Sequence, residues 1–247
     1  MRIRNAIFAI VLAACSNPVS PTHSVDYDPY AAPADFGARY LGAKYVNDPL
    51  GEGAGYDADP LIRTDAFDCL TFVETVLACG DVERLNKIRY AGGDISFENR
   101  NHFFTADWLR NNSGLVENVS GDFGDTAMRL GTVTRADWFR AMHGMDIDAA
   151  PTDVDLRYVP YSKLNVFDVS EPVLVAFVVN NPETSHRIHS DILVGHVGFL
   201  MPGGVLRHAS SAAGRVMDTD FKEYTASRAR TKTNLGVAFF KIKEFCR

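Results

Sequence analysis

The stretch TDAFDCLTFVETVLACG, residues 64–80, predicts a short helix with a cysteine in its first turn. Asp68 is a suitable N-cap residue, which places Cys69 at the start of the helix, and Gly80 ends the pattern. The positive end of the helix dipole and the unpaired backbone N–H groups there lower the pKa of a thiol and can hold an oxyanion. Cys69 is therefore a candidate nucleophile, although such a cysteine, taken alone, is more often a small buried apolar side chain. Apolar residues recur at helical spacing: Leu70, Val73, Val76 and Leu77.

The second half of the chain has the pattern of β-strands. Helical patterns dominate before it, at residues 34–41, 64–80, 105–110 and 135–140, and one more helix is expected at 220–229. Helices followed by neighbouring strands predict an α+β fold in which helices pack on an antiparallel sheet. The expected strands are β-branched or apolar runs separated by Gly, Pro and Asn: residues 171–179, 194–201, 205–210, 214–218 and 235–243.

Two of the expected strands flank Pro202, and each carries a histidine. A hairpin centred on Pro202 places His196 directly opposite His208 on the same face of the sheet, provided that its loop has an odd number of residues. One imidazole could then take a thiol proton while the other orients it, which is the arrangement of nucleophile, base and orienting residue. Gly195 and Gly198 flank the first histidine and would let another segment approach closely. A single strand histidine is usually structural, but two facing histidines favour a catalytic role.

The chain begins with a pattern typical of a bacterial lipoprotein signal. Two arginines precede an apolar run, residues 6–14, that is too short to span a bilayer and ends in Leu-Ala-Ala before Cys15. We expect residues 1–14 to be a signal peptide, Cys15 to be lipidated, residues 15–33 to form a tether rich in Pro and Ser, and residues 34–247 to form one domain. The expected location is the periplasm, anchored to the outer membrane. An ordinary secretory signal is the alternative.

Charge and cysteine content restrict the partners and the disulfides. The formal net charge of −6 gives no reason to expect nucleic acid or an anionic membrane surface as a partner. If Cys15 is lipidated, at least one of the three other cysteines is unpaired in an oxidising compartment. On one continuous helix, Cys69 and Cys79 would lie about 15 Å apart, too far for a disulfide. A pair between Cys79 and Cys246 stays open.

Three motifs resemble the NlpC-type papain-like cell-wall cysteine peptidases: DCLTFVE at residues 68–74, HVGF at 196–199 and HAS at 208–210. More narrowly, the chain resembles the N-acetylmuramoyl-L-alanine amidase-like family, also through the stretches IRYAGG, RNHFFTADWLRNN and YVPYSKL. The resemblance covers the chain from about Asp35 to Lys243. It implies a papain-like core with the nucleophile at a helix N-terminus packed on an antiparallel sheet.

The resemblance implies a catalytic trio. Cys69 would be the nucleophile, His196 the general base and His208 the residue that orients the base. Tyr45 matches a tyrosine that helps to line the site, although the aromatic-Gly-Gly continuation of the wider superfamily is absent after it. No cofactor or metal is implied. Three more residues are candidates for substrate contacts: Asp68, for which a helix cap is an equal explanation, and Arg100 and His102, which could bind sugar or peptide carboxylates.

The reaction implied is hydrolysis of the amide between the lactyl group of N-acetylmuramic acid and L-alanine. The substrates would be small muropeptides, including anhydro-sugar fragments, and the intermediate a muramoyl thioester. We expect a monomer whose partners are a muropeptide or peptidoglycan fragment and, through the lipid anchor alone, the membrane. An endopeptidase of the same fold, cutting between D-Glu and the diamino acid, is the first alternative.

Two further functions stay open. His186, His189 and His196, with Asp191 between them, could supply zinc ligands, and zinc muramoyl amidases cut the same bond. Against zinc, residues 182–185 are predicted to form a surface loop, and no carboxylate is placed as in a zinc protease motif. A lipoprotein that binds peptidoglycan without cleaving it is the non-enzymatic alternative, but all three residues of the trio are present.

Overall fold

The computed structural model describes residues 36–245, and a ten-stranded sheet runs through the whole of this part. The strand order is β2-β1-β9-β8-β7-β6-β10-β5-β4, and β3 pairs with β10. Neighbouring strands of the described residues pair antiparallel except β1 with β2, which confirms the α+β fold with an antiparallel sheet. The strands are β1 Lys44–Tyr45, β2 Ala66–Phe67, β3 Val116–Asn118, β4 Ala127–Val133, β5 Thr152–Pro160, β6 Val173–Val179, β7 Val194–Met201, β8 Val205–Ser210, β9 Arg215–Asp220 and β10 Asn234–Ile242.

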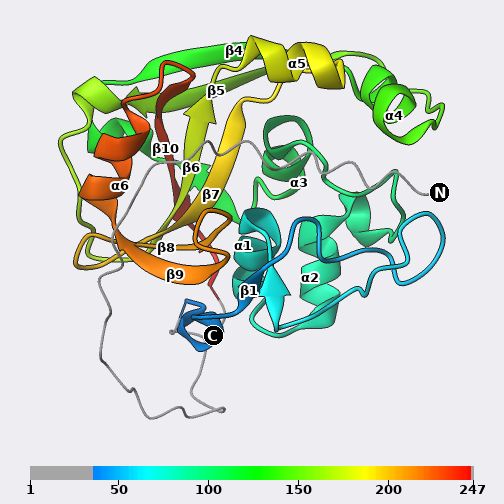
Figure 1. Cartoon of the computed structure of the whole chain (residues 1–247), viewed down its shortest axis with the longest axis horizontal. Coiled ribbons are helices and arrows are strands. Elements are labelled where there is room, and N and C mark those ends of the chain that lie inside the picture. The colour runs from blue at the N-terminus through cyan, green and yellow to red at the C-terminus, as the bar shows by residue number, and fades with distance from the viewer. Residues whose placement is uncertain (1–35, 246–247) are drawn as a thin grey trace.

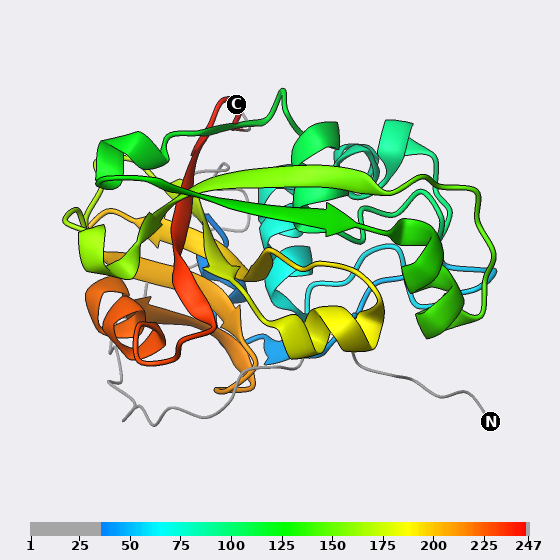
Figure 2. The same cartoon turned by 90° about the horizontal axis from the view of Figure 1, so that it is seen from above.

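Helices cover both faces of this sheet (Figure 1). α1 packs on β7 and β8 and against α2, whereas α6 lies on the other face beside β9. Seen from above, the long antiparallel pair β4 and β5 crosses the molecule from the α6 side to α4 (Figure 2). The α-helices are α1 Cys69–Ala78, α2 Val82–Arg89, α3 Leu109–Asn111, α4 Arg135–His143, α5 Pro182–Ile188 and α6 Phe221–Arg228, and Phe104–Trp108 forms a π-helical turn before α3.

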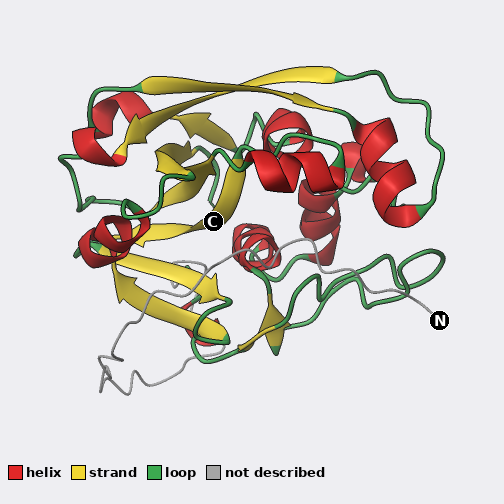
Figure 3. Cartoon of the chain, turned by 45° about the horizontal axis from the view of Figure 1, so that its top comes forward, coloured by secondary structure: helices red, strands yellow, loops and turns green. Residues whose placement is uncertain are grey.

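The central strands are apolar on both faces, because both faces are covered. In β10, Ala238 and Phe240 pack in the core under α1, while Val237 and Phe239 pack in the core under α6. The two cores therefore follow the two-residue period of a strand. Figure 3 shows the sheet curling between the two groups of helices.

The helix at residues 69–78 begins as predicted. The Asp68 carboxylate accepts the Thr71 backbone N–H at 2.8 Å, and the Thr71 hydroxyl accepts the Asp68 N–H at 3.0 Å, which together form a capping box. At the other end, Cys79 takes a left-handed conformation with φ 59° and Gly80 follows at φ 79°. The five predicted strands and the helices at 105–110, 135–140 and 220–229 are also confirmed.

Two local predictions are wrong. Of the helix expected at 34–41, the described part contains only one 3-10 turn, Ala38–Tyr40, between a left-handed Gly37 and the bend before Gly42. The predicted loop at 182–185 is instead the start of α5, because Pro182 occupies the first helical position and the Asn181 side chain accepts the Thr184 N–H at 3.2 Å.

The expected signal peptide, tether and lipidated Cys15 lie outside the described residues. None of the helices in residues 36–245 is long and apolar enough to cross a membrane.

Candidate active site

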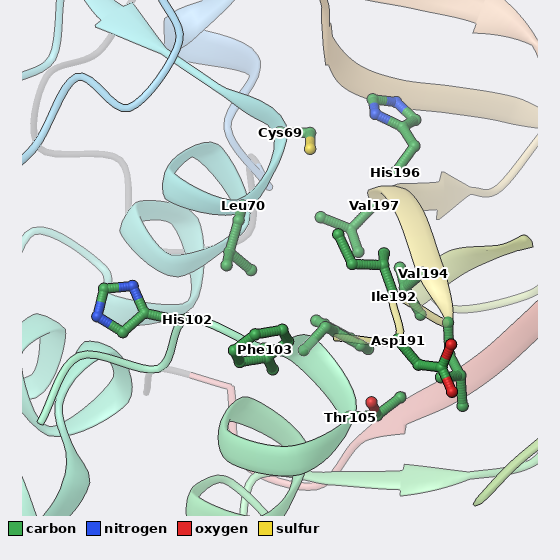
Figure 4. A pocket seen from close by; sticks show the side chains of 12 residues that line it. Cys69, Leu70, His102, Phe103, Thr105, Asp191, Ile192, Val194, His196 and Val197 are labelled. Atoms are coloured by element: carbon green, nitrogen blue, oxygen red, sulfur yellow. The ribbon is translucent and has the colours of Figure 1, made fainter. Parts of the chain in front are cut away.

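Three segments that are distant in the sequence line one cavity beside Cys69 (Figure 4). They are the start of α1, residues 102–105, and residues 191–197 without Gly195. Apolar side chains make up most of the lining. Cys69 and His196 both border this cavity and are 5% and 7% exposed. The structure therefore brings the predicted nucleophile and the predicted base to one partly open cavity.

Cys69 is a free thiol at the first position of α1. Its own backbone N–H and those of Leu70 and Val197 are directed at the sulfur. Burial and, to a smaller extent, the Asp68 carboxylate raise the pKa of the Cys69 thiol to about 12, although these N–H groups lower it. The sequence-based expectation of a lowered thiol pKa is thus wrong, because burial outweighs the effect of the helix terminus. The resting thiol is neutral.

This neutral thiol predicts the pH dependence of alkylation. With the pKa of Cys69 near 12, the thiolate fraction rises about tenfold per pH unit throughout the accessible range. The rate of labelling by iodoacetamide should therefore climb steadily between about pH 7 and pH 9, without a plateau. Mass spectrometry of wild type and Cys69→Ala measures the rate and its background. A plateau below about pH 7 would instead indicate a stable thiolate–imidazolium pair.

The two predicted histidines form a hydrogen-bonded pair. His196 Nε2 and His208 Nδ1 are 2.7 Å apart, and the rings meet edge to face at a centroid distance of 4.9 Å. On the far side, His208 Nε2 lies 3.4 Å from the Thr219 hydroxyl of β9. His196 is hydrogen-bonded to His208 and not to the Cys69 thiol. Because Nε2 of His196 is occupied by His208, Nδ1 is the ring nitrogen left to act as a base.

The register of the hairpin differs from the prediction by two residues. Phe199 pairs with Arg207 and Met201 with Val205, which leaves a three-residue loop centred on Gly203 instead of Pro202. Gly203 and Gly204 take φ values of 86° and 71°, which a proline cannot adopt, so the glycines form the centre of the turn. The loop has an odd number of residues, and His196 and His208 lie on the same face of the sheet, both as predicted. The two histidines are diagonal neighbours instead of directly opposite.

Glycines on β7 explain how the pair fits. The ladder between β6 and β7 shifts by one residue at Gly195, since His196 pairs with Phe177 but Val194 pairs with Val178. Bulges of this kind re-aim side chains beside functional sites. A Cβ at Gly198 would lie 2.9 Å from the Cβ of His208, so only a glycine lets His208 lie against β7 there.

Substitution of Gly198 should therefore disturb the histidine pair. Gly198→Ala forces β7 and β8 apart, and we expect a loss of about 1–3 kcal/mol of unfolding free energy together with a lower kcat. Urea unfolding and turnover of a muropeptide measure the two effects. Gly121→Ala is the matched control, because a Cβ at Gly121 meets no atom within 4 Å. Equal stability and activity in both variants would contradict this account of Gly198.

Both imidazoles are held uncharged. Burial first, and then the neighbouring His208 and the Arg228 cation, keep the pKa of His196 well below its ordinary value. Burial and Arg228 likewise lower the pKa of His208 to about 3. The site at rest thus contains a neutral thiol and two neutral imidazoles, so any proton transfer from sulfur must accompany attack on a substrate.

Tyr45 and Asp68 lie on the side of Cys69 that faces β1. Tyr45 of β1 pairs with Phe67 of β2 in a short parallel ladder, and Phe67 precedes Cys69 by two residues. Burial and, after it, the nearby Cys69 and Asp68 raise the pKa of the Tyr45 hydroxyl, so this hydroxyl is a neutral hydrogen-bond donor. The oxygens of Asp68 accept hydrogen bonds from Thr71 and from the Asp48 backbone N–H at 3.2 Å, which places Asp68 as a helix cap.

Arg100 and His102, the two candidates for contacts with sugar or peptide carboxylates, both have partners within the protein. The Arg100 side chain is 9% exposed and is bound by three carboxylates of one loop, Asp48, Glu52 and Asp57, at 2.7 to 3.1 Å. His102 borders the cavity, but its imidazole is turned away from Cys69 and its Nε2 lies 2.6 Å from the Phe97 carbonyl oxygen (Figure 4). Arg100 thus fastens a loop next to the site.

The remaining candidates are the cysteines and the zinc ligands. Cys79 is disulfide-bonded, and the question of its pairing with Cys246 falls outside the described residues. His186 and His189 are exposed at the end of α5, whereas His196 is buried against His208. Within residues 36–245, no group of three or more His, Cys, Asp or Glu side chains is arranged to hold a metal ion.

Sequence reasoning missed several residues that surround the site. Phe103, Phe104 and Thr105 line the cavity, although the sequence pointed to them only as part of the family-like stretch at residues 100–112. Tyr224 of α6 contacts both histidine rings, at centroid distances of 6.1 and 5.1 Å. No local signal in the sequence relates α6 to this hairpin, because the contact depends on how the chain crosses the sheet.

Comparisons with known proteins identify the family and the fold. A family model described as AmiA-like, N-acetylmuramoyl-L-alanine amidase-like, matches residues 35–232. A search of curated proteins finds no match. Among solved structures, a protein from Legionella pneumophila is 22% identical with a TM-score of 0.76, over 87% of this chain and 90% of that chain.

An N-acetylmuramoyl-L-alanine amidase from Bacteroides uniformis is 21% identical with a TM-score of 0.66, over 86% of this chain and 98% of that chain. A candidate xylanase from Bacteroides fragilis is 20% identical with a TM-score of 0.64, over 85% and 100%. Likeness at these identities shows a shared fold.

Proposed function

The chain belongs to the N-acetylmuramoyl-L-alanine amidase-like family, and on that premise we propose that it is a cysteine amidase that cleaves the bond between the lactyl group of N-acetylmuramic acid and L-alanine in small muropeptides. The family supports a hydrolase that acts on peptidoglycan. The observation that carries it is the cavity shared by Cys69 and His196, with His196 bonded to His208 at 2.7 Å.

The hydrogen bonds around the pair define one set of tautomers for this chemistry. For His196 to accept a proton at Nδ1, its Nε2 must carry the hydrogen and donate it to His208 Nδ1. His208 then carries its hydrogen on Nε2, facing the Thr219 hydroxyl at 3.4 Å. Each ring thereby fixes the orientation of the next, as the third member of a triad does.

Attack by sulfur then proceeds without a stable ion pair. The thiol proton of Cys69 moves to His196 Nδ1 while the sulfur adds to the lactyl carbonyl carbon. The backbone N–H groups of Leu70 and Val197 and the neutral hydroxyl of Tyr45 are donors for the developing oxyanion. His196 passes the proton to the alanine nitrogen, the C–N bond breaks and the stem peptide leaves. Water, deprotonated by His196, hydrolyses the thioester and restores the thiol.

The position of the cut tests this function. Purified anhydro-muramoyl tetrapeptide is incubated with the protein, and the products are identified by mass spectrometry. Free tetrapeptide and an anhydro sugar acid are the expected products. If the sugar product keeps a dipeptide, the protein is the endopeptidase and not the amidase. If the fragment remains intact, and larger wall fragments also remain intact, the catalytic proposal is refuted and a binding function takes its place.

A further inference from the structure

A cationic side chain that the proposed reaction does not use lies next to the histidine pair. The guanidinium of Arg228, in the last turn of α6, lies 5.7 Å from the ring centroid of Phe177 and 5.9 Å from that of Tyr224. The same two rings contact the histidines, since Phe177 lies 5.6 Å from His196 and Tyr224 lies 5.1 Å from His208. Arg228 is therefore separated from the pair by a single layer of aromatic rings.

The charge of Arg228 is not neutralised by an acidic partner. Its Nε is buried without a hydrogen-bond partner among residues 36–245. The ion pairs within this part of the chain do not include Arg228, and the polar side chain beside its guanidinium is the uncharged Tyr161 hydroxyl. A buried or half-buried arginine is normally paired with a carboxylate. Cation–π contacts stabilise this half-buried side chain instead, and they leave its positive charge to act on the imidazoles.

The other groups around the pair do not offset this field. Cys69 faces His196 from α1 as a neutral thiol, and Tyr224 faces both rings from α6 with a hydroxyl pKa that burial raises to about 12. Tyr161 lies beside Arg228, and burial also raises the pKa of its hydroxyl. Neighbouring His208 and Thr219 contribute no negative charge. Arg228 is thus the only formal charge of the described residues that faces the pair from these elements.

We propose that Arg228 is a positioning residue of the site, whose charge keeps the His196–His208 pair unprotonated until the thiol proton arrives. This inference rests on the proposed function, in which His196 must be a free base. A cation beside an imidazolium also makes that imidazolium a stronger acid. The same charge therefore favours transfer of the proton from His196 to the alanine nitrogen, the step on which amide cleavage depends.

Titration of the histidines tests the proposal without requiring turnover. The full chain is labelled with ¹⁵N-histidine and followed by NMR between about pH 4 and pH 8, and variants of His196 and His208 assign the signals. In wild type, neither ring of the pair should be protonated within most of this range. In Arg228→Gln, the first protonation of the pair should move up by about one pH unit, and the acid limb of kcat/KM should move with it.

Two charge controls separate this role from packing. Arg228→Lys keeps the charge and should titrate as wild type, and Arg230→Gln removes an exposed charge two residues further along the chain and should change nothing. Arg228→Met replaces the glutamine variant if that variant does not fold. A pair that titrates near the ordinary histidine range in wild type, or an unchanged titration in a folded Arg228→Gln, would overturn the proposal. Absence of amidase activity with the predicted titration shifts would reject the proposed function and leave the electrostatic role standing.

Discussion

Replacement of Cys69 by alanine should lower kcat/KM for a small muropeptide by at least about 10⁴-fold, while binding of the same fragment changes by only a few-fold. The cavity wall at this position is formed mainly by other residues, so removal of one sulfur leaves the binding surface intact. Turnover is measured by chromatography of the products after the reaction is stopped at fixed times. The affinity of the variant for the fragment is measured by calorimetry. Cys69→Ser should also be inactive, because a buried hydroxyl is harder to ionise than a thiol.

The same experiment distinguishes thiol chemistry from zinc chemistry. Wild type assayed with a metal chelator should retain its turnover if Cys69 is the nucleophile. Substantial turnover by Cys69→Ala, or loss of wild-type turnover with the chelator and its return with zinc, would contradict a cysteine mechanism. Inactivity combined with loss of binding would show that the substitution damages the cavity and not the chemistry.

Removal of the Arg100 guanidinium should have the largest effect on stability. Arg100→Met leaves Glu52 and Asp57 without their cation, and the side chains of these acids are 7% and 16% exposed. Breaking one partner from a buried ion pair costs about 3–5 kcal/mol. Urea unfolding of wild type and variant measures the loss. The Asp48 side chain is 59% exposed and adds little to this figure.

Arg140→Met is the matched control. Arg140 also binds two carboxylates, Asp137 and Asp146, but its side chain is 61% exposed. We expect this variant to lose less than about 1 kcal/mol. Equal losses in the two variants would show that the loop from Asp48 to Asp57 is not held by Arg100. Because Asp48 also donates its backbone N–H to the Asp68 cap, a loosened loop should raise KM more than it lowers kcat.

Local chemistry explains what could be predicted from the sequence. The start of α1 depends on Asp68 and Thr71, which are three residues apart, and the side-chain face of the two histidines depends only on an odd loop. The exact register was wrong because the positions of the two glycines in the turn outweigh that of Pro202. β5 was missed although Val154, Leu156 and Tyr158 alternate with charged residues, a pattern that predicts a strand.

Long-range contacts explain what could not be predicted. The thiol pKa depends on burial by segments distant from the helix start, and burial outweighs the nearby N–H groups. The role of Arg100 depends on a loop more than 40 residues earlier in the chain, at Asp57. The position of Tyr224 against His208 depends on α6 crossing to the hairpin. None of these contacts can be predicted from the residues that neighbour it in the sequence.

The most direct test of the central claim is mass spectrometry of the intact protein after rapid acid quenching of a reaction with anhydro-muramoyl tetrapeptide. An acid quench traps a thioester between enzyme and sugar if one forms during turnover. We predict a mass increase equal to the anhydro-muramoyl group, located by peptide mapping at Cys69 and absent from Cys69→Ala. Release of free tetrapeptide without any such adduct, at every time from the first turnover to the steady state, would contradict acylation of Cys69.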